Sequence, residues 1–494
     1  MNRDCLINDR GYKMVVIILA ILFLAVMAFN INIWNDESFS IILANQKWGE
    51  ILKFAALDVH PPLYYLLLKA FVFISGSSIV SYKMFSVLFY SLNLFWFLPI
   101  QKLFGKREGW YYILFSAFMP AMLRRGIEIR MYSLVSFLVT GAIVFCIKYI
   151  ENRDKKNILF FLFFSITSMY THYYAVIVML CVYFIIFLHF WKNDRKREKE
   201  LLFMAFVNGL LYLPWAGCVF NQIEYIVGKG ERFFMPSFSI MSIIYYVVYY
   251  FHTGINFYTA VSTVVFYGVF LYGIWKIWRD RDKNAKILKT LSILYFIVPF
   301  LIIIISLFIK NIMGAKYSSC YVGVFHILLA VFVARISKKR SRNMITVFLV
   351  STTLLTYSDM NSDQYDQGIA TMVAEAEAFE VVVCGEALSA ETMGTCIGGD
   401  KKVYLMEDHQ SYTSAFGVYK LNNKFLLPYE IIGYDELAEM DDNAIMYINL
   451  DDLQRMNLEN MEIELEVEKE IWSKYQSKRY KVINVGMETP LKSS

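Results

Sequence analysis

Long apolar stretches separated by short polar ones run along the first 357 residues. Apolar runs of roughly 18–22 residues recur there, and a helix of that length crosses a hydrocarbon core of about 30 Å. The pattern predicts an all-α polytopic membrane domain over residues 1–357, with about 11 spans. The spans are expected near 14–33, 81–101, 110–123, 131–149, 157–170, 173–191, 201–219, 256–275, 288–309, 319–334 and 343–357.

The first apolar run, from Met14 to Ile33, is expected to be a retained span rather than a cleaved signal peptide. It is longer than a typical signal-peptide core, and it ends in Trp34-Asn35-Asp36 instead of in small residues. The composition agrees with a membrane protein. The chain is 57% hydrophobic and only 18% charged, whereas soluble domains are about 25% charged.

Residues 358–494 have a different pattern, which predicts a small soluble α/β domain. Short apolar runs suited to buried strands occur at 381–383, 402–406 and 444–448. Residues 462–468 alternate at period two, as a half-exposed strand would, and residues 480–485 could pair with them as a hairpin. The two cysteines of this domain, Cys384 and Cys396, are compatible with a disulfide or with two thiols.

Charge is divided unevenly between these two parts. Residues 358–494 contain 11 Lys and Arg against 26 Asp and Glu, a balance of −15, so the rest of the chain carries +20. An acidic soluble domain argues against nucleic acid as a partner. The positive-inside rule places the N-terminus and the basic loops in the cytoplasm. These basic segments are 3–13, 102–107, 148–156, 192–199, 276–289 and 335–342.

The apolar run from His60 to Ile74 decides the topology. Counting it as a span would invert every later loop, and it has only about 13 apolar positions, interrupted by Lys69. We interpret it as a helix in the outer interface, and the tyrosine-rich segment 239–252 likewise. Residues 34–80 then form one outer loop, and the tail is extracytoplasmic. The alternative is a true span paired with another that the pattern misses.

The outer loop contains the residues best suited to chemistry. The adjacent acids Asp36 and Glu37 follow the first span, and further on come Asp58, Val59 and His60, followed by Pro61-Pro62. The two prolines restrict the backbone and keep the histidine out of the helical region, so an acid and an imidazole precede a rigid helix. The alternative for such acids is a plain role in solubility or in capping the helix that follows.

Together these motifs resemble those of protein O-mannosyltransferases and, more broadly, of the GT-C superfamily of membrane glycosyltransferases, which includes aminoarabinose transferases. The segment from Gly126 to Ser133, with Glu128, Arg130 and Tyr132, is similar to a second motif of the bacterial members. The turn from Tyr170 to Tyr174 and the pair Lys316-Tyr317 also fall where such proteins carry short polar turns. The resemblance covers roughly residues 14–357, and the tail matches no such pattern.

The resemblance implies an inverting transfer of a sugar from a polyprenyl-phosphate carrier to an acceptor, which stays open. The acceptor hydroxyl must lose a proton as it attacks, and Asp36 matches the catalytic position, with Glu37 orienting it or the acceptor. The phosphate leaving group needs positive charge, for which Arg130 is the first candidate, followed by Arg124 and Arg125. The other residues expected at the donor or its phosphate are Asp58, His60, Glu128, Tyr132, His172, Lys316 and Tyr317.

Each of these assignments has a simpler alternative. Arg130 could anchor the chain at the membrane interface, His172 could be a hydrogen-bonded structural histidine, and Asp58 could cap the next helix. Glu128 aligns only loosely with an acidic residue of the transferases. The sequence contains no metal-binding pattern and indicates no cofactor, although a divalent ion beside the outer-loop acids is an alternative.

Three other functions compete with the transferase. A transporter or flippase of lipid-linked glycans would be expected to show paired halves with broken helices, and no internal repeat is visible. A polymerase of lipid-linked units would also place acids and arginines outside, but it does not predict the Asp-Val-His-Pro-Pro element. A membrane-anchored binding module leaves the outer-loop acids unexplained.

Overall fold

The computed structural model shows two compact units. The first contains residues 1–29, 52–76 and 81–360, and the second contains residues 30–51, 77–80 and 361–494. The second unit therefore includes the beginning of the outer loop as well as the tail. The structure describes residues 3–30, 32–191, 194–228, 238–251, 257–280, 283–309, 311–364, 367–385, 387–397, 401–406, 427–433, 436, 444–449, 467–473 and 478–485.

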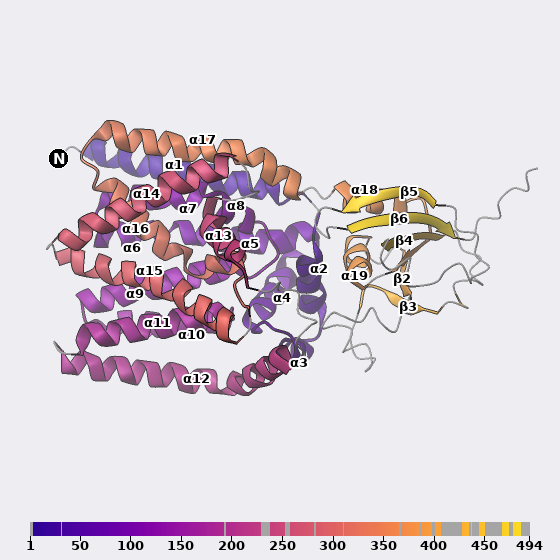
Figure 1. Cartoon of the computed structure of the whole chain (residues 1–494), viewed down its shortest axis with the longest axis horizontal. Coiled ribbons are helices and arrows are strands. Elements are labelled where there is room, and N and C mark those ends of the chain that lie inside the picture. Colours follow the sequence, from indigo (N-terminus) through magenta and orange to yellow (C-terminus); the bar gives the residue numbers. More distant parts are fainter. Residues whose placement is uncertain are drawn as a thin grey trace, which may run out of the picture. The chain divides into compact units, whose positions relative to one another are not determined.

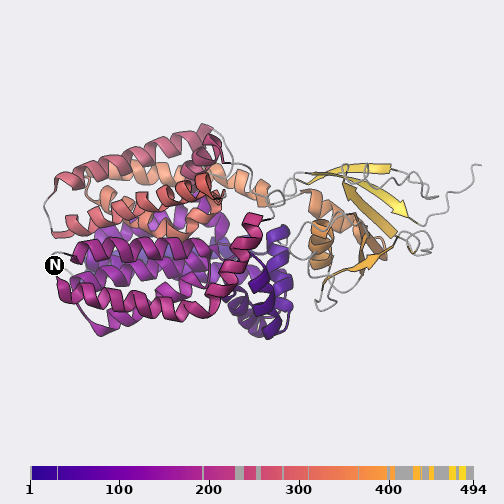
Figure 2. The ribbon, with the colours of Figure 1, turned by 60° about the horizontal axis from the view of Figure 1, so that its bottom comes forward.

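Helices running side by side build the first unit (Figures 1 and 2). In chain order they are α1 (Arg3–Met27), α3 (Trp48–Leu57), α4 (Leu63–Ser75), α5 (Ile79–Leu94), α6 (Phe97–Leu103), α7 (Lys106–Phe118), α8 (Pro120–Arg125), α9 (Tyr132–Glu151), α10 (Lys155–Met169), α11 (Tyr173–Phe190), α12 (Arg195–Gly228), α13 (Ile240–Val248), η1 (Tyr249–Phe251), α14 (Phe257–Arg279), α15 (Lys283–Phe308), η2 (Ala315–Tyr321), α16 (Val322–Ala334) and α17 (Lys339–Gln364).

Among the described residues, seven helical segments are long and apolar enough to span a membrane. They are 79–103, 132–151, 173–190, 195–224, 259–279, 285–308 and 315–334. The other four expected spans are helical as well, as α1, α7 with α8, α10 and α17. The expected interfacial segments form the shorter helices α4 and α13. The chain is thus an all-α polytopic membrane protein with a small added sheet.

Burial within the first unit separates a protein core from surfaces suited to lipid. Every residue of α16 is buried, and α16 packs against α7 and α9. Conversely, α12 exposes large apolar side chains such as Phe206 and Phe220 along its length. Exposed apolar side chains along a helix are what a bilayer accommodates.

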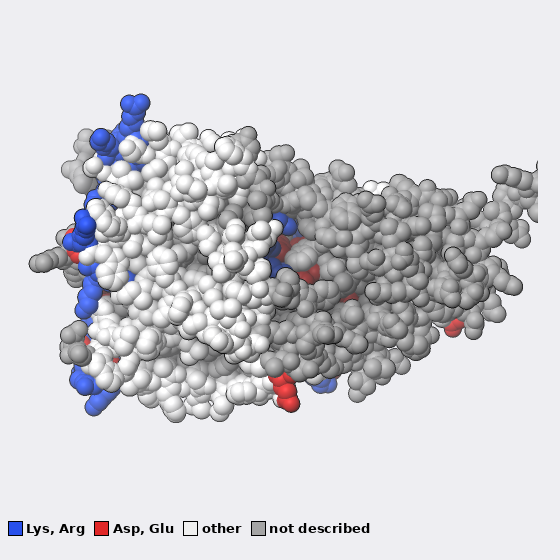
Figure 3. All heavy atoms as spheres, in the orientation of Figure 1, with Lys and Arg blue, Asp and Glu red and all other residues white. Residues whose placement is uncertain are grey.

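Lys and Arg side chains gather at the end of the first unit where the N-terminus lies (Figure 3). The connections from α9 to α10, from α11 to α12 and from α14 to α15 lie at this same end (Figure 1). Ion pairs join neighbouring segments there, between Arg153 and Glu200 and between Arg335 and Asp280. The basic loops that the charge pattern grouped together therefore do share one end of the helical unit.

The second unit is built around a six-stranded sheet with strand order β3-β2-β1-β4-β6-β5. The strands are β1 (Val381–Cys384), β2 (Lys402–Met406), β3 (Glu430–Ile432), β4 (Ala444–Asn449), β5 (Val467–Ser473) and β6 (Lys478–Val485). The first four pair in parallel, while β6 pairs antiparallel with β4 and β5. The helices of this unit are α2 (Asn35–Asn45), α18 (Gln367–Ala376) and α19 (Ala387–Ile397).

This sheet confirms the α/β interpretation of the tail. The predicted strands at 381–383, 402–406 and 444–448 are β1, β2 and β4. Residues 381–384 and 444–447 are buried, and β2 buries Val403, Leu405 and Met406. The predicted hairpin exists as β5 with β6, where Val467 pairs with Ile483. Residues 462–466 of the expected strand lie outside the described residues.

Candidate functional site

A short motif before α4 starts the site. Pro61 and Pro62 follow His60, and α4 begins immediately afterwards at Leu63. The residue before a proline is restricted to extended conformations, so the histidine cannot join the helix. The Leu63 backbone N–H donates to the Tyr170 carbonyl at 3.1 Å. This bond fixes the start of α4 beside the turn between α10 and α11.

Asp58, His60 and Arg130 form a continuous hydrogen-bonded chain. The Oδ2 atom of Asp58 lies 2.9 Å from Nδ1 of His60, and Nε2 of His60 lies 3.1 Å from an Nη2 donor of Arg130. A guanidinium can only donate, so Nε2 of His60 accepts. The proton of the His60 ring is therefore on Nδ1, which donates a hydrogen bond to Asp58. The two neighbours thus select one tautomer of His60 and set the direction of the arginine side chain.

Arg130 is held by the turn between α8 and α9. Its backbone N–H donates to the Glu128 carbonyl at 2.7 Å, which closes the turn tightly. Ser86 of α5 donates its hydroxyl to that same carbonyl. The guanidinium-bearing side chain is only 3% exposed, which disfavours the alternative of an interface anchor reaching into solvent.

Glu128 and Arg125 form a second buried element of the site. Their side chains make an ion pair, and Nε of Arg125 donates to the Tyr249 hydroxyl at 2.6 Å. The Arg125 guanidinium also lies over the ring of Tyr132, 5.1 Å from its centre. A buried carboxylate requires a charged partner, and Arg125 is that partner for Glu128. The same ion pair orients the Arg125 side chain.

Sequence reasoning ranked Arg125 behind Arg130 and did not find Tyr249. The spacing of three residues between Arg125 and Glu128 could have indicated the ion pair. Tyr249 lies far away in sequence, in η1, within a segment that looked only interfacial.

His172 lies at the N-terminus of α11, and its two ring nitrogen atoms have different surroundings. Its Nδ1 accepts the backbone N–H of Tyr174 at 3.1 Å, so the histidine caps the helix. Burial, together with the positive charges of Arg130 and Lys316, holds the pKa of His172 well below its usual range. The ring is therefore neutral at physiological pH, and its one proton is on Nε2.

Aromatic rings surround His172. The ring centres of Tyr132 and Tyr317 lie 6.2 Å and 5.1 Å from that of His172, and the ring of His60 lies 6.2 Å away. Lys316 carries its ammonium 5.9 Å from the centre of the Tyr317 ring. The structure thus brings together seven residues expected at the donor: Asp58, His60, Arg130, Tyr132, His172, Lys316 and Tyr317.

Two buried donors in this cluster make no hydrogen bond to any of the residues that the structure describes. They are the Tyr132 hydroxyl, on a side chain that is 0% exposed, and Nε2 of His172, on one that is 4% exposed. Around them lie three cations, Arg125, Arg130 and Lys316, against two carboxylates, Asp58 and Glu128. Buried donors normally have partners. A positively charged cluster with two such donors is chemically suited to an anion.

The fold of this chain can be compared with the folds of solved structures. The chain has the fold of ArnT. ArnT from Cupriavidus metallidurans in the apo state, an aminoarabinose transferase, superposes with a TM-score of 0.67 at 11% sequence identity, over 97% of this chain and 98% of that one. The same protein bound to undecaprenyl phosphate gives a TM-score of 0.65 at 11% identity, over 96% and 98% of the two chains. The sequence matches no protein-family model and no curated protein.

This likeness confirms the resemblance to GT-C membrane glycosyltransferases at the level of the fold. It covers the tail as well as the helical unit. The motif-based resemblance reached only to residue 357, so the GT-C fold extends further than the sequence motifs indicated.

Asp36 and Glu37 lie in the first turn of α2, in the second unit. The carboxylate of Glu37 accepts the backbone N–H of Trp34 at 3.1 Å, and Glu37 is buried. Glu37 thus caps the start of its own helix. Asp36 is half-buried.

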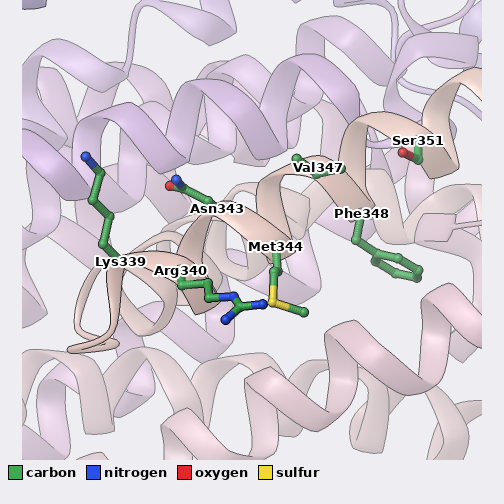
Figure 4. A pocket seen from close by; sticks show the side chains of 7 residues that line it. All are labelled: Lys339, Arg340, Asn343, Met344, Val347, Phe348 and Ser351. Carbon is green, nitrogen blue, oxygen red and sulfur yellow. The ribbon is translucent and has the colours of Figure 1, made fainter.

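The surface hollow shown in Figure 4 contains none of these residues. Its volume is about 720 Å³, and its lining side chains, from Lys339 to Ser351, recur every three or four residues along one face of α17. It is a shallow depression on a single helix. Nor does any group of three His, Cys, Asp or Glu suited to a metal ion occur within the described ranges.

Proposed function

We propose that this protein is an inverting glycosyltransferase that moves a sugar from a polyprenyl-phosphate carrier to an acceptor on the outer face of a cell membrane. The observation that carries the proposal is the positively charged cluster around Arg130, in which the Tyr132 hydroxyl and Nε2 of His172 are buried donors with no hydrogen-bond partner among the described residues. A phosphate supplies several acceptor oxygens and negative charge together.

The likeness in fold supports the choice of carrier. The solved ArnT structure with undecaprenyl phosphate shows that a protein of this fold binds such a lipid. A polyprenyl phosphate also explains why the anion pocket belongs to a helical membrane unit, because its hydrocarbon chain requires a lipid-accessible position.

In the proposed reaction, the acceptor oxygen attacks the anomeric carbon while its proton passes to the Asp36 carboxylate. The bond between the anomeric carbon and the phosphate oxygen breaks, and its electron pair leaves with the polyprenyl phosphate. Attack opposite to the leaving group inverts the anomeric centre. Arg130, Lys316, Tyr132 and His172 stabilise the charge that develops on the phosphate.

His60 and Asp58 act through Arg130 in this scheme. By accepting from the guanidinium at Nε2, His60 directs the remaining donors of Arg130 to one side, and Asp58 maintains the tautomer that makes this possible. A pre-oriented guanidinium costs little reorganisation when the phosphate binds.

The topology belongs to the proposal too. The N-terminus and the basic loops face the cytoplasm, and residues 34–80 and the domain 358–494 lie outside. The transferred sugar is a hexose or a pentose, and the acceptor is a glycan, a lipid or a protein. The competing function is a transporter or polymerase of lipid-linked glycans, which would use the same anion pocket.

The test is an assay of polyprenyl-phosphate release by purified protein supplied with a panel of polyprenyl-phosphate sugars and candidate acceptors. We expect release by the wild type and a loss of roughly two or more orders of magnitude in Asp36→Asn, because the general base is removed. The matched control is Asp154→Asn, at the N-cap of α10, where asparagine caps equally well. Equal turnover in Asp36→Asn and wild type would refute the mechanism. Movement of the intact lipid-linked sugar across vesicles, without release, would favour the transporter.

A further inference from the structure

The tail domain holds the helix that carries Asp36. Within the second unit, α19 packs against α2, although more than 340 residues separate them in the chain (Figure 1). The Thr392 hydroxyl of α19 donates to the side-chain oxygen of Asn35 at 2.8 Å. Thr392 is only 1% exposed and Asn35 is half-buried, so this hydrogen bond is partly shielded from water.

A second residue of α2 lies within reach of the same threonine. The hydroxyl oxygens of Ser38 and Thr392 are 3.5 Å apart, and Ser38 also donates to the Asn35 carbonyl at 2.9 Å. Asn35 and Ser38 are three residues apart and share one face of the helix. The tail therefore contacts the first turn of α2 at two positions that flank Asp36.

The geometry of a helix makes these contacts consequential. Consecutive residues are about 100° apart around the axis, so fixing the face of Asn35 and Ser38 also fixes the direction of the Asp36 side chain. The helix α2 has only 11 residues, and isolated helices of fewer than about 12–15 residues are marginally stable in water. Glu37 caps its first turn, but a cap within a helix does not set the rotation of that helix about its axis, which depends on contacts with other elements.

We propose that Thr392 is a positioning residue, and that the tail domain serves to hold the first turn of α2 so that the Asp36 carboxylate is correctly oriented for proton transfer. This inference rests on the proposed function, in which Asp36 is the general base. The inference gives the tail domain a role in positioning α2, whereas the sequence motifs indicated no role for this domain.

The experiment compares three variants in the full-length protein. Thr392→Val removes the hydrogen bond that Thr392 donates to Asn35 while keeping the shape of the side chain. Thr392→Ser keeps the hydroxyl. Thr395→Val is the matched control, because Thr395 lies one turn further along α19 and its hydroxyl donates to the Glu391 carbonyl of its own helix. Each protein is examined for hydrogen exchange of the α2 amides and for kcat and donor KM.

We expect the amides of residues 35–45 to exchange roughly threefold to tenfold faster in Thr392→Val, since one buried hydrogen bond is lost. We expect kcat to fall about tenfold with donor KM within about twofold of wild type, because a displaced base slows chemistry without weakening carrier binding. Thr392→Ser and Thr395→Val should resemble wild type in both measurements.

Wild-type exchange and wild-type kcat in Thr392→Val would overturn the inference, and so would equal effects of Thr392→Val and Thr395→Val. The exchange measurement does not depend on catalysis. Faster hydrogen exchange of the α2 amides in Thr392→Val, combined with full activity of Asp36→Asn, would refute the proposed function. It would still support the inference that the tail domain stabilises the position of α2.

Discussion

Tyr132 shows how a single side chain can favour ligand binding over stability. Its hydroxyl is buried and, among the residues described, lacks a hydrogen-bond partner, so the folded protein bears the desolvation cost of that group. Unsatisfied buried groups persist where the surrounding structure compensates and where a ligand supplies the missing partner.

We therefore expect Tyr132→Phe to separate binding from stability. The affinity for undecaprenyl phosphate should fall roughly fivefold to tenfold, while the free energy of unfolding stays the same or rises by about 1 kcal/mol. Tyr112→Phe is the reverse control. The Tyr112 hydroxyl donates to the Asn93 carbonyl at 3.3 Å, so its loss should lower the unfolding temperature and leave lipid affinity unchanged. Wild-type lipid affinity in Tyr132→Phe would argue against the anion pocket.

At the scale of elements, the site depends on two turns that neighbouring helices hold in place. Pro120 ends α7 and begins the short helix α8, and the turn from Gly126 to Met131 follows α8. Ser86 of α5 and Ser133 of α9 then bind its carbonyl groups at Glu128 and Arg125. The Leu63 N–H fixes the second turn, at Tyr170.

Ser86→Ala tests whether this anchoring matters for the site. The loss of the hydrogen bond to the Glu128 carbonyl should cost about 1 kcal/mol of stability, and it should weaken undecaprenyl-phosphate binding several-fold by loosening the turn that carries Arg130. Ser91→Ala on the same helix is the control, because its hydroxyl donates to the Val87 carbonyl of α5 itself. Equal lipid affinity in Ser86→Ala and Ser91→Ala would show that the turn needs no such anchor.

On the scale of the whole molecule, the concentration of Lys and Arg at one end of the helical unit supports a single orientation in the membrane (Figure 3). The proposed reaction needs this orientation, because the acids of the outer loop must face the compartment that holds the acceptor.

Cysteine labelling in intact cells checks the orientation. In a chain whose seven native cysteines are replaced, Glu430→Cys in the tail should react with an impermeant maleimide. Arg340→Cys, at the start of α17, should react only after the membrane is permeabilised. Both positions are exposed in the structure. The opposite labelling pattern would reverse the topology and remove the proposed site from the outer face.

Much of the element-level structure followed from local patterns. Apolar length predicted the helices, and short apolar runs such as Val381–Val383 predicted the strands, because burial of one continuous segment is a property of neighbouring residues. The prolines after His60 and the basic turn at Arg130 likewise indicated residues that the structure brings together. The fold likeness to ArnT agrees with the motif resemblance.

Local patterns could not predict contacts between residues that are far apart in the sequence. Glu37 was expected to orient Asp36 or an acceptor, which stays a prediction, but no local pattern indicated that its carboxylate also accepts the Trp34 N–H and caps α2. Nothing local indicated that Arg125 binds Tyr249 or that Thr392 binds Asn35, since each partner is far away in the sequence.

The sequence by itself determined the membrane helices, the acidic α/β tail and the residue types available for chemistry, because these follow from the period and length of apolar runs and from charge. Only the tertiary structure decided the tautomer of His60, the burial of the Tyr132 and His172 donors and the attachment of the tail to α2. Those features depend on which polar atoms meet after packing, and hydrogen bonding acts over about 3 Å in space regardless of distance along the chain.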